Sequence, residues 1–382
     1  MGLNSFHPYR IMKTIALICT SVNELGGKNN HMRSIYKGMS ARGWKVYLVL
    51  CSKVEKELKA FMLSGGVASE DLIFLTRWKK WFFIPFIFEL KGVLAAKKID
   101  IVHSFQIQSD VFAAIAARLA KRPCLLSYYE SQFLTNDFML KNILYKSVNA
   151  LVKNWFGKTV VVSNGLKKEI AKDGFRPHER IEVIHIGIDP PFIKEFHFNG
   201  LMEKKPIIGT IGRFSEEKAL KRFVNVMPYV LKEFPGVKFI LVGKGPEEKE
   251  LKARVSSLGI NASVTFKPWT DNVYKELEGF DIFVMTSIRE GCPFALLEAM
   301  AVARPCVASN IEGIKDIIQD KESGILVNTE DVKAFSGKII DLCRQPQQTI
   351  ALGMSGYARV IKSFTVEEEM SKIHNLYMSV VK

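Results

Sequence analysis

Short apolar runs alternate with stretches of helical periodicity along the first half of the chain. The apolar runs predict strands at residues 14–19, 46–51, 72–75, 99–103, 123–127 and 159–162. A polar stretch over about 28–42 predicts a helix between the first two of them. This alternation is typical of a parallel sheet that carries helices on both faces.

The second half repeats the pattern more clearly. Strands are expected at 207–211, 238–242, 264–266, 282–285 and 306–308, and helices at 247–258 and 294–303. The stretch after residue 219 has an apolar face at helical spacing, formed by Leu220, Phe223, Val226, Met227, Val230 and Leu231. The turn-rich range 186–206 is expected to be a linker. We therefore predict domains over 1–190 and 191–365, and a final helix over 366–382 that packs back on one of them, the first in our assignment.

Composition narrows the class of protein. The 382 residues are 48% hydrophobic and 24% charged, which is typical of globular proteins and too apolar for a disordered chain. Six scattered cysteines without a C-x-x-C pair argue against a zinc site or a disulfide framework, and favour a reducing compartment. No apolar run approaches the ~18 residues of a spanning helix, and no signal peptide precedes the first strand. Secreted, integral-membrane and repeat proteins are therefore not expected.

The net charge of +15 is distributed unevenly. Residues 1–190 carry 28 basic against 15 acidic side chains, whereas residues 191–382 carry 26 against 24. Such asymmetry favours contact between the first domain and something anionic, either nucleic acid or a membrane surface. A basic surface that serves only solubility is the alternative.

Glycine-containing loops follow several of the predicted strands. They lie at 26–27, 212–218, 243–245 and 289–293. In open parallel sheets, ligands bind at the carboxyl ends of the strands, where such loops meet helix N-termini. Because Arg213 and Lys218 add two cations to the backbone N–H groups, a diphosphate is the anion that such loops would suit. Each loop taken singly is also compatible with an ordinary turn.

Glu290 and Glu298 form the most specific pair of candidate residues. Their spacing places one carboxylate in a loop at a strand end and the other about one turn into the next helix. The first N–H groups of that helix, from Phe294, Ala295 and Leu296, lie between them and would favour a phosphate. The carboxylates would then be free to accept hydrogen bonds from sugar or ribose hydroxyls.

The run from Glu290 to Glu298 resembles the E-x7-E signature of retaining glycosyltransferases of family 4, which have the GT-B fold. Further motifs in the family's order extend the resemblance over nearly the whole chain: Gly26–Gly27, Val162-Ser163-Asn164, Ile186-Gly187-Ile188-Asp189, Gly212-Arg213 with Lys218, Val242-Gly243-Lys244-Gly245-Pro246, and Ser323-Gly324-Ile325-Leu326-Val327. The resemblance implies an α/β protein with two Rossmann-like domains facing a central cleft. Residues 1–190 would bind the acceptor, and residues 191–365 the nucleotide sugar.

By the same resemblance, the enzyme transfers a hexose with retention from a nucleotide sugar, a UDP-sugar in preference to a GDP-sugar. The acceptor would be a glycan or a lipid-linked precursor in polysaccharide or lipopolysaccharide biosynthesis. Arg213 and Lys218 would hold the leaving diphosphate, Glu290 would bind the donor sugar and Glu298 the ribose. The other donor-binding positions are Gly27, Gly212, Gly243, Gly291, Phe294, Ala295 and Leu296. Since no D-x-D motif occurs, neither a metal nor another cofactor is expected.

The chain departs from the family pattern at a few positions. Ala219 and Ala303 stand where glycine is usual, and Phe294 where a small or amide residue is usual. More important is the region of His103, because Phe105 occupies the place of the histidine that is commonly aimed at the donor. Two interpretations of His103 therefore stay open: it assists catalysis, or it is a structural histidine at a strand end.

A cationic and aromatic segment precedes residue 84. Basic and aromatic side chains together favour an element lying among lipid headgroups, and here they are Arg77, Trp78, Lys79, Lys80, Trp81, Phe82 and Phe83. A helix buried in the acceptor domain is the alternative. We expect a cytoplasmic protein, peripheral on the inner face of the membrane, that does not bind nucleic acid, since no nucleic-acid motif accompanies the charge.

Two rival functions also fit the sequence. A GT-B nucleotide-sugar epimerase would convert the donor without any acceptor. A catalytically silent scaffold that binds nucleotide or lipid would show no turnover at all.

Overall fold

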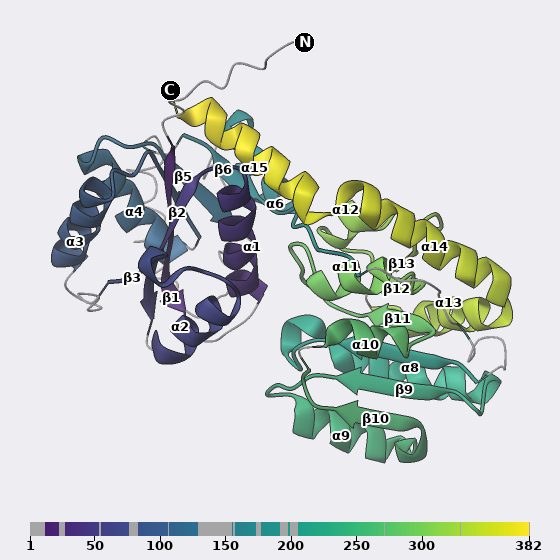
Figure 1. The fold of residues 1–382 in the computed structure, drawn as a ribbon. Coiled ribbons are helices and arrows are strands. Elements are labelled where there is room, and N and C mark those ends of the chain that lie inside the picture. Colours follow the sequence, from purple (N-terminus) through teal and green to yellow (C-terminus); the bar gives the residue numbers. More distant parts are fainter. Residues whose placement is uncertain are drawn as a thin grey trace, which may run out of the picture. The chain divides into compact units, whose positions relative to one another are not determined.

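The computed structural model describes residues 12–22, 27–52, 55–75, 83–105, 107–128, 155, 157–172, 177–191, 198, 205–270, 272–328 and 330–381. The chain forms two compact units, each continuous in space but not in sequence (Figure 1). The first unit comprises Met1–Val161, Lys167–Ile184 and Glu369–Lys382, and the second Val162–Leu166 and His185–Glu368.

The described part of the first unit contains a seven-stranded, fully parallel sheet in the order β3-β2-β1-β4-β5-β6-β7. Its strands are β1 (Thr14–Val22), β2 (Lys45–Ser52), β3 (Leu72–Phe74), β4 (Ile101–Ser104), β5 (Cys124–Tyr128), β6 (Thr159–Val161) and β7 (Ile181–Val183). Its helices are α1 (Gly27–Ala41), α2 (Glu55–Ser64), α3 (Phe83–Ala96), α4 (Ile107–Leu119), α6 (Asn164–Lys172) and most of α15 (Val366–Val380). Right-handed crossovers place α3 and α4 on the sheet face opposite α1 and α2, and α3 contacts α4.

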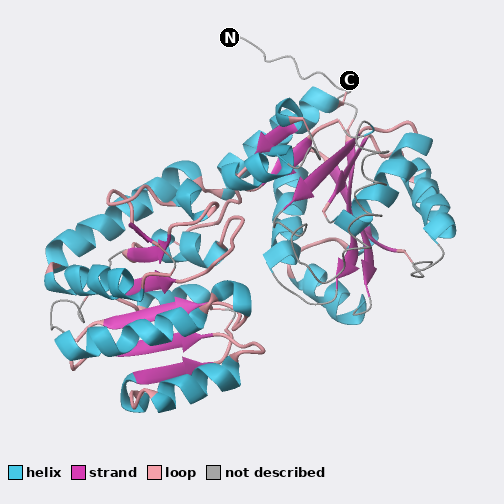
Figure 2. Ribbon diagram, turned by 180° about the vertical axis from the view of Figure 1, so that it is seen from behind, coloured by secondary structure: helices cyan, strands magenta, loops and turns pink. Residues whose placement is uncertain are grey.

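The second unit contains a six-stranded parallel sheet in the order β10-β9-β8-β11-β12-β13. Its strands are β8 (Ile207–Ile211), β9 (Lys238–Val242), β10 (Val264–Lys267), β11 (Ile282–Met285), β12 (Cys306–Ser309) and β13 (Ile325–Val327). Its helices are α8 (Leu220–Glu233), α9 (Glu248–Ser257), α10 (Val273–Glu278), α11 (Phe294–Ala301), α12 (Ile314–Ile317), α13 (Val332–Arg344) and α14 (Pro346–Ser363). In both units, strands are flanked by helices (Figure 2).

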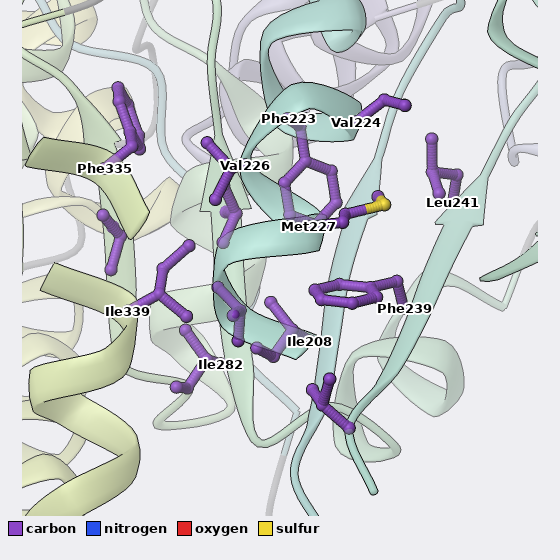
Figure 3. Packing of buried hydrophobic residues seen from close by; sticks show 14 of the residues in the cluster. Ile208, Phe223, Val224, Val226, Met227, Phe239, Leu241, Ile282, Phe335 and Ile339 are labelled. Carbon is purple, nitrogen blue, oxygen red and sulfur yellow. The ribbon is translucent and has the colours of Figure 1, made fainter. Parts of the chain in front are cut away.

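The core of the second unit shows how the apolar periodicity is used. Phe223, Val226 and Met227 of α8 lie against Ile208 of β8 and Phe239 of β9 (Figure 3). All five side chains are fully buried. Helix α8 also contacts α13, whereas α11 contacts α14. The helical apolar face predicted after residue 219 is therefore the face that covers the sheet.

The parallel-sheet architecture predicted from the apolar pattern is confirmed. Strands β8, β9 and β11 have the predicted bounds, and the other predicted strands differ by a few residues at their ends. The pattern predicts neither β7, in which Glu182 lies between Ile181 and Val183, nor β13 at Ile325–Val327, each of which is only three residues long. The start of the expected linker is also packed: Ile186 and Ile188 are buried, and Ile188 forms a parallel bridge with Thr365. Turn residues alone could not reveal this long-range pairing.

None of the described helices has the length and apolar composition that are needed to cross a membrane.

Candidate functional site

Two loops at neighbouring strand ends carry the charged residues singled out above. Strand β8 ends at Ile211, and a loop with a 3₁₀ turn at Glu216–Lys218 leads to α8. Strand β11 ends at Met285, and its loop leads through Glu290 to α11. Because β8 and β11 pair in parallel, both loops leave the same edge of the sheet.

Hydrogen bonds hold these two loops against each other. The Ile288 N–H donates to the Glu217 carbonyl at 2.9 Å. The Thr286 hydroxyl lies within hydrogen-bond distance of the carbonyls of Lys218 and Ala219, at 3.3 and 3.2 Å. Thr286 is buried, so its contacts with the loop after β8 are shielded from solvent.

The central contact of the site is an ion pair between Lys218 and Glu290. The Nζ of Lys218 lies 2.6 Å from Oε1 of Glu290, and the Ser287 hydroxyl donates to the same oxygen at 2.6 Å. The Glu290 side chain is only 9% exposed, against 26% for Lys218. Within the described part of the chain both bonds fall on Oε1, so the second oxygen is the one that could accept from a ligand hydroxyl.

Ala219 explains how the chain turns from Lys218 into α8. Its φ of 47° lies in the left-handed region, where glycine is the residue without strain. Ala303, the other alanine at a position where glycine is usual, also has a positive φ, of 55°. Both departures from the family pattern therefore occupy glycine-like conformations.

The glycines after β8 and β9 are needed for different physical reasons. A Cβ on Gly243 would lie 1.9 Å from the Gly212 carbonyl oxygen, and one on Gly245 would lie 2.3 Å from that of Phe214. These two glycines allow the two loops to pack backbone against backbone. A Cβ on Gly212 would meet only the Lys218 side chain, at 4.0 Å, which leaves its backbone open to approach by a ligand.

Arg213 lies two residues after the end of β8 and is exposed. Its charge and that of Lys218 act on Glu217, which also accepts a hydrogen bond from Ser215 at 2.7 Å. Partial burial raises the pKa of Glu217, but the hydrogen bonds and the two cations outweigh it and lower the pKa below its ordinary value. The loop is thus a place where negative charge is favoured.

Glu298 has a different environment from Glu290. It lies on α11, and burial raises the pKa of its carboxyl group to about 7. The neighbouring Tyr274 of α10 donates its hydroxyl to the Asp189 carbonyl at 3.1 Å. Burial, together with the negative charges of Glu298 and Asp189, raises the pKa of Tyr274. Near neutral pH, Glu298 can therefore exist as acid or carboxylate.

The N-terminus of α11 offers fewer N–H groups than the sequence suggests. The N–H of Leu296 donates to the Pro293 carbonyl at 3.2 Å. Helix geometry leaves those of Phe294 and Ala295 without an intrahelical partner. The Leu296 N–H therefore has a backbone partner in the tight turn on Pro293, and the approach of an anion to these three groups stays a prediction.

Three supporting residues were missed by the sequence analysis: Thr286, Ser287 and Gly313. A Cβ on Gly313, whose φ is 87°, would lie 2.4 Å from the Glu290 carbonyl oxygen and 2.5 Å from that of Gly291. Gly313 therefore allows the loop after β12 to support the Glu290 loop. The polar pair after β11 was a usable signal, whereas Gly313 has no local signature.

His103 lies in the first unit, on β4, and is buried. Its Nδ1 lies 2.6 Å from the Tyr377 hydroxyl of α15, and its Nε2 lies 2.6 Å from the Ser127 hydroxyl of β5. Burial, aided by the nearby His31, lowers the pKa of His103 to about 3. Phe105, also buried, packs against the ring with centroids 4.2 Å apart. Of the two interpretations left open, this arrangement favours the structural one.

Several other predicted residues fall partly or wholly outside the description. Gly27 is the first residue of α1, but its surroundings lie outside the described residues. The segment 76–82 itself lies outside the described residues, and it contains Arg77, Trp78, Lys79, Lys80, Trp81 and Phe82. Phe83 opens α3. Among the described residues, no three histidine, cysteine or carboxylate side chains are grouped as metal ligands.

Family models match both halves of the chain. The model described as "Glycosyltransferase Family 4" matches residues 25–192, and that described as "Glycosyl transferases group 1" matches residues 192–359. Between them they cover nearly all of the two sheets.

Similarities that extend over most of the chain agree with these matches. An uncharacterised glycosyltransferase of Haemophilus influenzae is 30% identical over 358 residues, 92% of this chain and 95% of its own length. The UDP-Gal:alpha-D-GlcNAc-diphosphoundecaprenol alpha-1,3-galactosyltransferase of Escherichia coli is 24% identical over 304 residues, 76% of this chain and 78% of its own. Among solved structures, HepE of Anabaena in complex with UDP has a TM-score of 0.81 at 18% identity, over 96% of this chain and 100% of that one.

Proposed function

The chain belongs to glycosyltransferase family 4, and on that premise we propose that it transfers a hexose from a UDP-sugar to a lipid-linked glycan, with retention and without a metal. The family and the GT-B fold of two Rossmann-like sheets, both predicted from the sequence, are confirmed. The single observation that carries the proposal is the Lys218–Glu290 ion pair, held between two loops at one sheet edge.

A nucleoside diphosphate would occupy the cationic side of this edge. Arg213 and Lys218 supply fixed positive charge, and Phe294 and Ala295 supply N–H groups at a helix N-terminus. UDP is the diphosphate we propose because the E. coli relative is named for UDP-Gal and HepE was solved with UDP. The diphosphate would draw Lys218 away from Glu290, freeing that carboxylate for the sugar hydroxyls. Glu298 would accept from the ribose.

The transfer itself breaks the bond between the anomeric carbon and the diphosphate oxygen. The electron pair stays on that oxygen, where the charges of Arg213 and Lys218 stabilise it. The acceptor hydroxyl forms the new bond on the same face of the sugar, and its proton leaves with the UDP. No covalent intermediate on the enzyme and no metal is needed for this balance.

The acceptor is proposed to be membrane-bound, and the enzyme to be cytoplasmic and peripheral on the inner leaflet. Support comes from the diphosphoundecaprenol named for the E. coli relative. It comes also from the composition of residues 77–83 and the excess of basic residues in the first half.

The test is UDP release and sugar transfer by wild type and Glu290→Gln. The substitution removes the charge that pairs with Lys218, and we expect the rate to fall roughly 10²–10³-fold, as for loss of one oriented group. The exposed Glu248, which pairs with Lys252 on α9, provides a control: Glu248→Gln should keep the full rate. UDP should still raise the melting temperature of both variants.

Other results would overturn the proposal. Conversion of the donor without an acceptor indicates an epimerase, and absence of turnover despite UDP binding indicates a silent scaffold. A rate that collapses with EDTA contradicts the metal-free mechanism.

A further inference from the structure

Helix α3 has an apolar face that is open to solvent. Ile84 is 61% exposed and Phe88 58% exposed. They lie four residues apart, and the remaining exposed positions of the helix continue the same stripe: Pro85, Gly92, Ala95 and Ala96. A side chain added at Gly92 would meet nothing within 4 Å, which shows how open this face is.

The opposite face of α3 is also apolar, and it is the one used for packing. Phe86, Ile87, Leu90 and Leu94 are buried, and Phe86 makes an edge-to-face contact with Phe112 of α4 at 6.0 Å. A surface helix normally places polar residues on its solvent side, and a helix that is apolar all round is normally buried. Helix α3 is apolar on its packed face and along its exposed stripe, and its two charged residues, Glu89 and Lys91, are both partly buried. Its exposed apolar stripe is therefore expected to have a partner.

Cations surround the C-terminal end of this face. Lys97 and Lys98 follow α3 directly, and Arg118, Lys121 and Arg122 lie at the end of α4, which packs on α3; all five are exposed. Asp100 lies 4.0 Å from Arg122, and α3 itself carries Glu89, so that two acidic side chains do not balance the five cations.

Two of the lysines stand where glycine would be the unstrained choice. Lys98 has a φ of 50° and Lys121 a φ of 55°, both in the left-handed region. Lysine near a helix C-terminus also interacts favourably with the helix dipole. The second unit also has a lysine in the left-handed region, Lys321, in a turn before β13. It is therefore the clustering of the lysines with apolar side chains that distinguishes this end of the first unit.

Exposed apolar side chains are mixed with these cations. Leu119, at the end of α4, is 47% exposed, and Trp155 is 36% exposed with the Arg118 guanidinium 4.9 Å from its ring centre. Trp, Lys and Arg around an apolar helix are the composition of elements that lie in the interface of a bilayer.

We infer that the outer face of α3 binds an anionic lipid surface, with the helix lying along the membrane plane and the cations at its C-terminal end contacting the headgroups. The inference rests on the proposed membrane-bound acceptor and names the surface that reaches it. A second copy of this chain is a less suitable occupant, because the same cations would face each other across the contact.

The experiment is flotation of the full chain with vesicles of phosphatidylcholine, with and without phosphatidylglycerol. Wild type should bind only the anionic vesicles. Ile84→Gln with Phe88→Gln should weaken binding about tenfold or more, and Lys97→Gln with Lys98→Gln about fivefold per charge removed. Since all four side chains are already exposed, these variants should fold.

Matched controls lie in the second unit. Met354→Gln and Lys249→Gln change an exposed apolar and an exposed basic residue, and both should bind as wild type does. The inference is overturned if wild type ignores anionic vesicles, if the Ile84/Phe88 variant floats unchanged, or if light scattering shows a dimer that this variant dissociates.

Turnover of a UDP-sugar with a water-soluble acceptor separates this result from the proposed function. If the inference is right, the α3 variants keep that turnover while losing vesicle binding. Vesicle binding without any turnover would instead leave the α3 surface standing and contradict the glycosyltransferase proposal.

Discussion

The two units use the polar residues on and after their strands differently. In the second unit, loops at the carboxyl ends of β8 and β11 bring Lys218 and Glu290 together at a partly exposed position. In the first unit, β4 and β5 place His103 and Ser127 at buried positions, where the imidazole bonds the Tyr377 hydroxyl. One sheet carries a partly exposed ion pair at its strand ends, and the other uses buried polar groups to attach the last helix.

The difference shows that similar folds can use titratable residues for opposite purposes. His103 is kept neutral, because burial lowers its pKa to about 3. It joins two further buried or partly buried contacts to α15: His31 bonds Glu369, and Trp44 donates to His374 at 3.0 Å. The residues of α15 from Glu369 onward are thus bound to the first unit by polar groups as well as by packing.

The largest expected effect is a loss of stability on substitution of His103, and its absence would contradict the structural role given to this residue in the first unit. The change His103→Leu leaves the hydroxyls of Tyr377 and Ser127 without their partner, and should lower the free energy of unfolding by about 2–4 kcal/mol at pH 7.5. UDP affinity should not change. Urea unfolding and UDP titration measure the two quantities.

The pH dependence sharpens this test. The depressed pKa means that the stability contributed by His103 is complete above pH 6.5 and is lost as the pH falls toward 3. The gap between wild type and His103→Leu should therefore narrow at pH 5. The exposed His178 offers a control, since His178→Leu should change little. A folded His103→Leu protein with unaltered stability and no turnover would support the catalytic interpretation instead.

The second unit should respond to pH with the opposite sign. The pKa of Glu298 is raised to about 7 from an ordinary value of 4.5, so the folded state binds the proton more tightly than the unfolded state. Stability contributed by this carboxyl group falls as the pH rises from about 4.5 to 7. At pH 8 the free energy of unfolding of Glu298→Gln should therefore be about 2–3 kcal/mol higher than that of wild type, as measured by urea unfolding.

A control and a second readout accompany that substitution. Glu322→Gln, at an exposed position, should leave the pH profile unchanged. If Glu298 accepts a ribose hydroxyl as proposed, Glu298→Gln should also weaken UDP binding even while it stabilises the protein. Equal stability of wild type and Glu298→Gln from pH 5 to 8 would contradict the raised pKa.

The smallest effects concern residues in left-handed conformation. Ala219→Gly relieves the strained φ but makes the unfolded chain more flexible, and should stabilise the protein by about 0.5 kcal/mol. Lys121→Gly also loses a cation at the end of α4, and its stability should change by less than about 0.5 kcal/mol. Thermal unfolding measures both.

The two changes should differ more in function than in stability. Lys121→Gly should weaken binding to anionic vesicles about fivefold, whereas Ala219→Gly should leave it unchanged. If both variants bound vesicles as wild type does, the cations beside α3 would have no role in docking.

The sequence by itself determined the parallel sheets and the order of the elements. Apolar runs such as 207–211 and 238–242 predict buried strands because their neighbours in the chain carry turn residues and helical periodicity. It also determined that Glu290 lies before a helix start and Glu298 after it. The two are only eight residues apart, and the turn residues that follow Glu290 give way to a helical run before Glu298. The charge asymmetry between the halves could be counted directly.

Only the tertiary structure decided what those residues contact. Nothing local distinguishes Gly313 from other turn glycines, yet its backbone supports the loop of Glu290. His103 and Tyr377 are 274 positions apart, so the burial that keeps the imidazole neutral could not be inferred from the motif around it. The apolar run of α3 was visible in the sequence, but which half of it is buried depends on where α4 packs. Contacts between distant segments set burial, and burial sets the pKa values and exposed faces on which function depends.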